Sequence, residues 1–149
     1  MNFLQSLAKY EDFIYTLQQR HICIQRSTLT VIRRGKAVAR LTGTLEIDGY
    51  RIQVREKLSF ADATGRIIGY GYEVWCGNEK LYWYDSQEHP NDPTLANTDP
   101  HHKHIPPNIK HHRVPAPALS FTEPNLPFLI REVEQLYELS VSPPTVISR

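Results

Sequence analysis

Cysteine is scarce in this chain, and the spacings of the common cysteine motifs are absent. Cys23 and Cys76 are the only cysteines among 149 residues, and each lies in an apolar run far from the other. Small secreted domains often depend on several disulfides, whereas proteins of a reducing compartment keep their thiols free. The sequence therefore predicts a cytoplasmic protein with two buried thiols and no cysteine-based metal site.

The chain also lacks a strong net charge and a long hydrophobic run. Seventeen Lys and Arg oppose sixteen Asp and Glu, so overall charge neither favours nor excludes nucleic acid as a partner. The first twenty residues carry charges inside their apolar stretch, which argues against a signal peptide and a membrane anchor. Length and composition predict one soluble domain, residues 1-149, with no membrane partner.

Apolar periodicity predicts a helix, then a sheet, then a second helix. Apolar residues recur every three or four positions near both ends of the chain, whereas the part between them alternates in short runs. Asp48-Gly49 and Gly77-Asn78 are two-residue hairpin signals. We predict an α+β domain with a meander of about five antiparallel strands and both helices on one face. The expected ranges are helix 3-20, sheet 22-85, a long His/Pro-rich loop 86-117, helix 126-139 and tail 140-149.

The clearest predicted strand separates apolar from basic side chains. Between positions 50 and 60, apolar residues alternate with Arg51, Arg55 and Lys57, and the hairpin would place Arg40 beside these cations. Such a patch either binds nucleic acid or an acidic partner, or it only discourages pairing between sheet edges. The sequence does not separate these two readings.

Glu56 falls on the apolar side of the same strand. A buried carboxylate costs several kcal/mol unless it is paired, and burial raises its pKa. Glu56 is therefore either bonded to a neighbouring Arg or Tyr for structural reasons or part of a functional site. Gly69 and Gly71, on the next predicted strand, indicate a bulge or the close approach of another segment, for which the histidine-rich segment is a candidate.

Histidine is concentrated in the segment with the least periodicity. The stretch DPHHKHIPPNIKHH, residues 99-112, holds five of the seven histidines. Ordering the whole loop, residues 86-117, costs roughly 1–2 kcal/mol per residue, whereas burial of its few apolar side chains returns about 1.5–3 kcal/mol each. The segment is therefore either mobile or held by hydrogen bonds, prolines, a ligand or a partner.

Three kinds of function fit such a segment. RNA cleavage needs a base, an acid and a cation near the phosphate, which histidines together with Lys103, Lys110 or Arg113 could supply. Metal binding would use His89, His101 and His104, with carboxylates such as Asp85, although the histidines follow one another too closely to converge without a sharp turn. The third is a polar arm, either solvated or exchanged with a partner or a second copy. His111 and His112 receive no role.

The order GYGYEVW, LYWYDSQEHP, DPHHKH resembles the TumE family, small prokaryotic proteins described as toxins of type II toxin–antitoxin systems. The resemblance covers most of residues 20-104, with QVREKLSF as the strand that carries Glu56 and PHHKH as its most specific motif. Trp83 stands where the family pattern has an Arg before Tyr-Asp. If that Arg binds phosphate in the family, another cation must do so here.

The resemblance implies a cytoplasmic toxin that is directed at RNA and controlled by an antitoxin protein. We expect a metal-independent ribonuclease without a cofactor. The alternatives are a non-enzymatic module that forms oligomers through residues 86-117, and a metal-binding protein. The expected catalytic residues are His101, His102, His104, Lys103, Asp85, His89 and Glu56, and the expected substrate-binding residues are Arg40, Arg51, Arg55, Lys57, Tyr72 and Tyr84.

Overall fold

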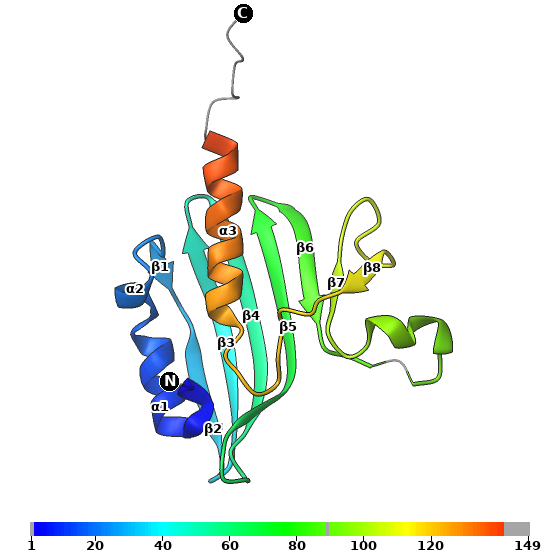
Figure 1. Ribbon diagram of the computed structural model, residues 1–149. Coiled ribbons are helices and arrows are strands. Elements are labelled where there is room, and N and C mark those ends of the chain that lie inside the picture. The colour runs from blue at the N-terminus through cyan, green and yellow to red at the C-terminus, as the bar shows by residue number, and fades with distance from the viewer. Residues whose placement is uncertain (1, 89, 142–149) are drawn as a thin grey trace, which may run out of the picture.

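A computed structural model describes residues 2–88 and 90–141 as one antiparallel sheet with helices on one face (Figure 1). The helical elements are η1 (Phe3–Gln5), α1 (Leu7–Tyr15), α2 (Leu17–Arg20), η2 (Pro93–Thr98) and α3 (Leu126–Val141). The strands are β1 (Arg26–Ser27), β2 (Thr30–Arg34), β3 (Val38–Ile47), β4 (Tyr50–Ser59), β5 (Arg66–Cys76), β6 (Glu79–Asp85), β7 (His102–His104) and β8 (Arg113–Pro115). None of the helices described is long and apolar enough to span a membrane.

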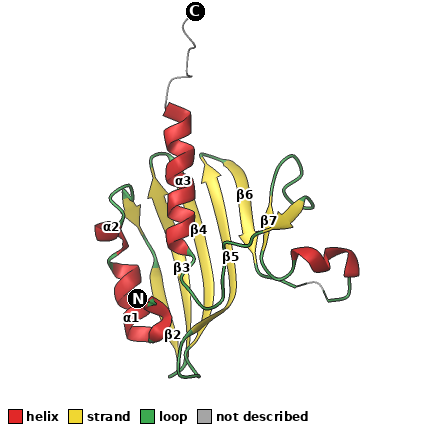
Figure 2. Cartoon of the chain, viewed as in Figure 1, coloured by secondary structure: helices red, strands yellow, loops and turns green. Residues whose placement is uncertain are grey.

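The predicted α+β class is confirmed, but the prediction of five strands is wrong. Within the described residues the sheet has eight strands, in the order β1-β3-β4-β5-β6-β7-β8, and β2 also pairs with β3. The predicted His/Pro-rich loop, residues 86-117, contains η2, β7 and β8, and the two strands extend the sheet beyond β6 (Figure 2). Strands of two or three residues are too short to show an alternating pattern, so the sequence did not reveal them.

The helices cover one face of the sheet, here called the inner face, and the opposite face is called the outer face (Figure 2). Tyr10, Phe13 and Ile14 of α1 are buried together with Leu129, Ile130 and Val133 of α3. The buried positions of β4 are Ile52, Val54, Glu56 and Leu58, as the alternation predicted. The outer face of β4 carries the polar residues between them. No α-helix of the described residues covers this face (Figure 2).

The two cysteines are free, but the expectation that both are buried is wrong. Cys76 is exposed at the end of β5, and Cys23 is partly buried. Cys76 is the last residue of β5, lies beyond the last buried residue of that strand, Val74, and pairs with Tyr50 at the end of β4. The run looked like core because it is apolar, but of its last three residues only Val74 is buried.

Glu56 lies in the core, between α1 and the sheet. The hydroxyls of Tyr10 and Tyr72 donate hydrogen bonds to its two carboxylate oxygens, and the amide of Asn125 donates to the Tyr72 hydroxyl at 3.1 Å. Burial raises the pKa of Glu56 to about 7, although the two tyrosine hydrogen bonds oppose that shift. The cluster joins α1, β4, β5 and the start of α3, so this buried carboxylate has a structural role.

The Glu56 cluster makes stability depend on pH in a defined window. Between about pH 4.5 and 7 the unfolded chain loses the Glu56 proton while the folded chain keeps it, so the free energy of unfolding falls as pH rises. The fall attributable to Glu56 is at most about 3 kcal/mol, and it is complete above pH 7. Urea unfolding of wild type and Glu56→Gln across pH 4–8 measures it. Glu79→Gln, at an exposed carboxylate, is the control. Parallel pH curves for wild type and Glu56→Gln would contradict the assignment.

Candidate functional site

The pairing of strands aligns the outward side chains of the sheet in rows. One row crosses β3 to β7 through Thr42, Arg55, Gly71, Asp85 and His102. The neighbouring row, two residues away along the strands, crosses β4 to β8 through Gln53, Glu73, Trp83, His104 and Arg113. Residues that are up to sixty positions apart in the chain therefore lie side by side on the outer face.

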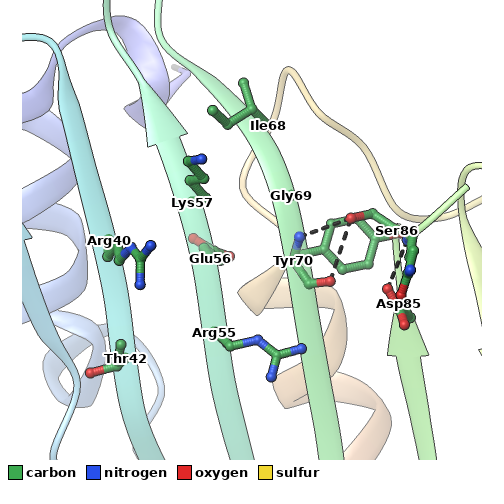
Figure 3. Close-up of a pocket in the computed structure, with 11 residues that line it drawn as sticks. Arg40, Thr42, Arg55, Glu56, Lys57, Ile68, Gly69, Tyr70, Asp85 and Ser86 are labelled. Atoms are coloured by element: carbon green, nitrogen blue, oxygen red, sulfur yellow. Dashed lines mark hydrogen bonds between the residues drawn. The ribbon is translucent and has the colours of Figure 1, made fainter.

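Gly71 allows Arg55 to lie across the sheet. A Cβ atom at position 71 would come within 2.2 Å of the guanidinium of Arg55, so only the absence of a side chain leaves room for it. Figure 3 shows Arg55 extending from β4 over β5 toward the strand that carries Asp85. The close approach expected at the strand glycines thus comes from an arginine side chain rather than from the histidine-rich segment.

A depression of about 530 Å³ on the outer face, here called the basic cavity, contains three of the four predicted cations (Figure 3). Arg40, Arg55 and Lys57 line it, and Asp85 and Gln87 form its opposite side. The fourth cation, Arg51, lies elsewhere: its guanidinium donates to the Gly77 carbonyl at 2.7 Å and covers the ring of Trp75.

A second depression of about 470 Å³, here called the histidine cavity, adjoins the first. It is lined by His104 and His111, by the cations Lys110 and Arg113, and by Asp85. Asp85 and Gln87 line both cavities, so the two form one continuous surface on the outer face. Two imidazoles, the carboxylates of Asp85 and Asp92 and several cations are therefore gathered in one place.

His102 lies beneath this surface and is fully buried. The guanidinium of Arg113 donates a hydrogen bond to its Nδ1 atom at 3.1 Å and pairs with Asp99 at 2.9 Å. Burial lowers the pKa of His102 to about 4, and the charge of Arg113 lowers it further, so the ring is neutral at pH 7. Because Arg113 can only donate, Nδ1 accepts and the proton of the neutral ring resides on Nε2.

Asp85, His102 and His104 are the one group in the described residues whose ligand atoms all lie within 4.8 Å of one another, as a metal site requires. This group differs from the predicted fallback set. His101 lies on the other face of the sheet, and His89 lies outside the described residues. The contact from Arg113 also opposes a metal ion, because it directs the His102 proton to the nitrogen that faces away from Arg113 and places a cation beside the group.

Lys103 and His101 face the helices rather than the outer face. Lys103 pairs with Glu132 of α3 at 3.3 Å, and its ammonium lies 4.2 Å from the ring centre of Tyr82. The Nδ1 atom of His101 is hydrogen-bonded to the Tyr70 hydroxyl at 2.7 Å, and burial lowers the pKa of this histidine. The motif PHHKH is therefore divided by the sheet into an inner pair and an outer pair.

The two predicted substrate-binding tyrosines are also on the inner face and are buried. Tyr72 donates to Glu56, and Tyr84 donates to Glu132 of α3 at 2.8 Å. The structure therefore assembles Asp85, His102 and His104 with Arg40, Arg55 and Lys57. It places Glu56, Tyr72, Tyr84, His101 and Lys103 in the layer beneath, and Arg51 near the β5–β6 turn.

His111 is the lining residue that sequence reasoning missed. The segment after β7 turns back at Pro106 and Asn108, and the Trp83 indole donates to the Ile109 carbonyl at 3.0 Å. This contact holds the turn against β6 and brings His111 over the same cavity as His104. The sequence does not reveal the role of His111, because no spacing pattern relates Trp83 to Ile109. Only the hydrogen bond to the Ile109 carbonyl in the structure shows it.

Comparison with protein families assigns the chain to a family. The family described as Toxin TumE matches residues 12–137, which is most of the chain. Comparisons with curated proteins and with solved structures found no match. The family match agrees with the resemblance of the GYGYEVW, LYWYD and PHHKH stretches, and the chain therefore belongs to the TumE family of toxins.

Proposed function

We propose that this toxin cleaves RNA on the outer face of its sheet by histidine acid–base catalysis. The observation that carries the proposal is the histidine cavity, where His104 and His111 share one depression with Asp85 and two cations. The adjoining basic cavity supports it, because Arg40, Arg55 and Lys57 offer a surface for the phosphates on either side of the reacting one. Membership of a toxin family also implies an antitoxin partner that restrains the activity.

The reaction uses the 2′-hydroxyl of the substrate as the nucleophile. One of the two imidazoles accepts the proton of this hydroxyl as its oxygen attacks the phosphorus atom. The other donates a proton to the 5′-oxygen as the bond from phosphorus to that oxygen breaks. The products are a 2′,3′-cyclic phosphate and a 5′-hydroxyl end, so no water and no metal enters the bond-breaking step.

The remaining residues of the site orient the imidazoles and stabilise the charge that develops on the phosphate. Lys110 at the cavity wall offsets the negative charge that develops on the phosphate, and Asp85 orients the His104 side of the site. Arg113 is held by Asp99 and His102, and it keeps His102 neutral and fixed beneath the cavity. His102 is then a positioning residue, because its ring is fully buried and, unlike the ring of His104, does not line the cavity.

The histidines are tested by substitution. His104→Ala and His111→Ala should each lower the rate of RNA cleavage by about 10²–10⁴, the usual contribution of a general acid or base. His21→Ala, in the turn after α2, should leave the rate unchanged. Single-turnover cleavage of a labelled RNA, with end-group analysis for the cyclic phosphate, is the measurement. Because His104 is buried and its loss could disturb folding, the exposed His111 provides the second variant.

Three results would count against this proposal. Diverse RNAs left intact by the purified toxin would exclude the ribonuclease. Wild-type rates in both histidine variants would exclude the assigned residues. Cleavage that chelator abolishes and a divalent metal restores would favour the group of Asp85, His102 and His104 as a metal centre.

Substitution of Gly71, which lies beneath the Arg55 guanidinium, tests whether Arg55 binds a phosphate. Gly71→Ala places a methyl group where the Arg55 guanidinium lies, and the flexible side chain must move away, while the fold stays intact. RNA binding should lose one phosphate contact, so the slope of log affinity against log salt should become shallower by about 0.7. Gly69→Ala is the matched control, because the nearest atom to its added Cβ lies at 3.9 Å. Equal slopes in the two variants would show that Arg55 does not bind a phosphate.

A further inference from the structure

A line of alternating cations and aromatic rings crosses the outer face and ends at the histidine cavity. The Arg51 guanidinium lies 4.8 Å from the ring centre of Trp75, and the Lys80 ammonium lies 5.5 Å from Trp75 and 5.3 Å from Trp83. The Trp83 indole stacks on the His104 imidazole, with 3.8 Å between ring centres and 8° between planes. We call Arg51, Trp75, Lys80, Trp83 and His104 the aromatic track.

The placement of the two tryptophans is unusual for such large apolar side chains. They are the only tryptophans in the chain, and both lie partly exposed on the outer face while the core is filled by other residues. The strands explain the line, because Arg51, Trp75 and Lys80 are direct pairing partners, as are Trp83 and His104. The track therefore occupies two neighbouring rows of the sheet.

We propose that the aromatic track binds the bases of single-stranded RNA and leads the strand to the histidine cavity. The proposal deepens the proposed function and rests on it for the identity of the substrate. Indole rings stack on any base, and the interleaved cations suit the phosphates that accompany the bases. The track shares His104 with the cavity, so a strand bound along it has a phosphate within reach of the reacting groups.

A single strand fits this surface better than a duplex does. In a duplex the bases stack on one another and expose only their edges, so an indole on an open sheet has no base plane to contact. A single strand can turn its bases onto the rings while its phosphates stay near Arg51 and Lys80. The substrate class that follows is single-stranded RNA of little base preference.

The Lys80 ammonium, which lies near both indole rings, is held weakly enough to make way for a base. Lys80 pairs with Glu73 at 3.7 Å, and both side chains are more than a quarter exposed. Partly exposed pairs of this kind contribute little, about 0–1 kcal/mol. Glu73 also accepts a hydrogen bond from the Trp75 indole at 3.0 Å, which holds the orientation of this ring on the outer face.

The track is tested by binding without cleavage. A fully 2′-O-methylated oligonucleotide has no nucleophile, so its affinity is independent of the ribonuclease. Because Trp75 and Trp83 are the only tryptophans, tryptophan fluorescence excited beyond the absorption of the eight tyrosines reports on the track alone. We expect saturable quenching by the single strand and an affinity for the same sequence as a duplex that is weaker by about tenfold or more.

Substitutions identify the residues involved, with affinity measured by fluorescence anisotropy of a labelled strand. Trp75→Ala should weaken binding by about tenfold, and Trp75→Phe should retain most of the affinity because a ring remains. Arg51→Ala should weaken binding and reduce its salt dependence. Arg131→Ala, an exposed arginine on α3 at the helix-covered face, is the matched control and should bind as wild type does.

The outcomes separate this inference from the proposed function. Wild-type affinity in Trp75→Ala, equal affinity for duplex and single strand, or equal quenching by a polyglutamate peptide would overturn the track. The last result would identify an acidic protein segment as its occupant. Binding as expected together with uncut natural RNA would keep the track and reject the ribonuclease. Cleavage of RNA with unchanged binding in Trp75→Ala would do the reverse.

Discussion

The pairing of β7 with β6 is the constraint on which the site depends. It places His102 opposite Asp85 and His104 opposite Trp83, and it extends the sheet into the segment with the fewest apolar residues. That segment has few apolar side chains to bury, so polar contacts hold it instead. They are backbone hydrogen bonds, the Arg113–Asp99 ion pair and the contact from Trp83 to the Ile109 carbonyl. The entropy of ordering it is thus offset by polar contacts to a rigid sheet.

The sheet also divides two kinds of polar residue. On the inner face, Glu56 and Glu132 accept hydrogen bonds from tyrosines and join the helices to the strands. On the outer face, cations and imidazoles surround cavities that open to solvent. The same residue types therefore stabilise the fold on one side and supply the chemistry proposed for the other.

Long alternating runs were predictable from the sequence, and short ones were not. The ten residues of β4 contain enough alternation to separate Glu56 from Arg55 and Lys57, and that separation is confirmed. The three residues of β7 carry no such signal, and which histidines face outward depends on their register with Asp85. The row through Gly71 was equally hidden, because it joins five strands and depends on the register of each strand with the next. Glu56 has the tyrosine partners that were one of its two expected environments.

Trp83 stands where the resemblance predicts an arginine, and its contacts show what the tryptophan does there. Its ring packs on His104 and its indole nitrogen holds the turn at Ile109, so this position has a structural role that an arginine would not fill in the same way. Cations stand around it in compensation, with Lys80 beside the ring and Arg113 paired across His104. The positive charge expected at this position is thus carried by neighbouring side chains.

The alternation of PHHKH between two faces has a consequence for how this family can diverge. A substitution within the motif alters one side chain, but an insertion or deletion of a single residue would shift the register of β7 against β6 and exchange its two faces. The lysine would then stand in the solvent-facing layer, and an imidazole would meet the carboxylate of Glu132. Length between the aromatic strand and the motif's end should therefore vary only in the turns, where added residues leave the register unchanged.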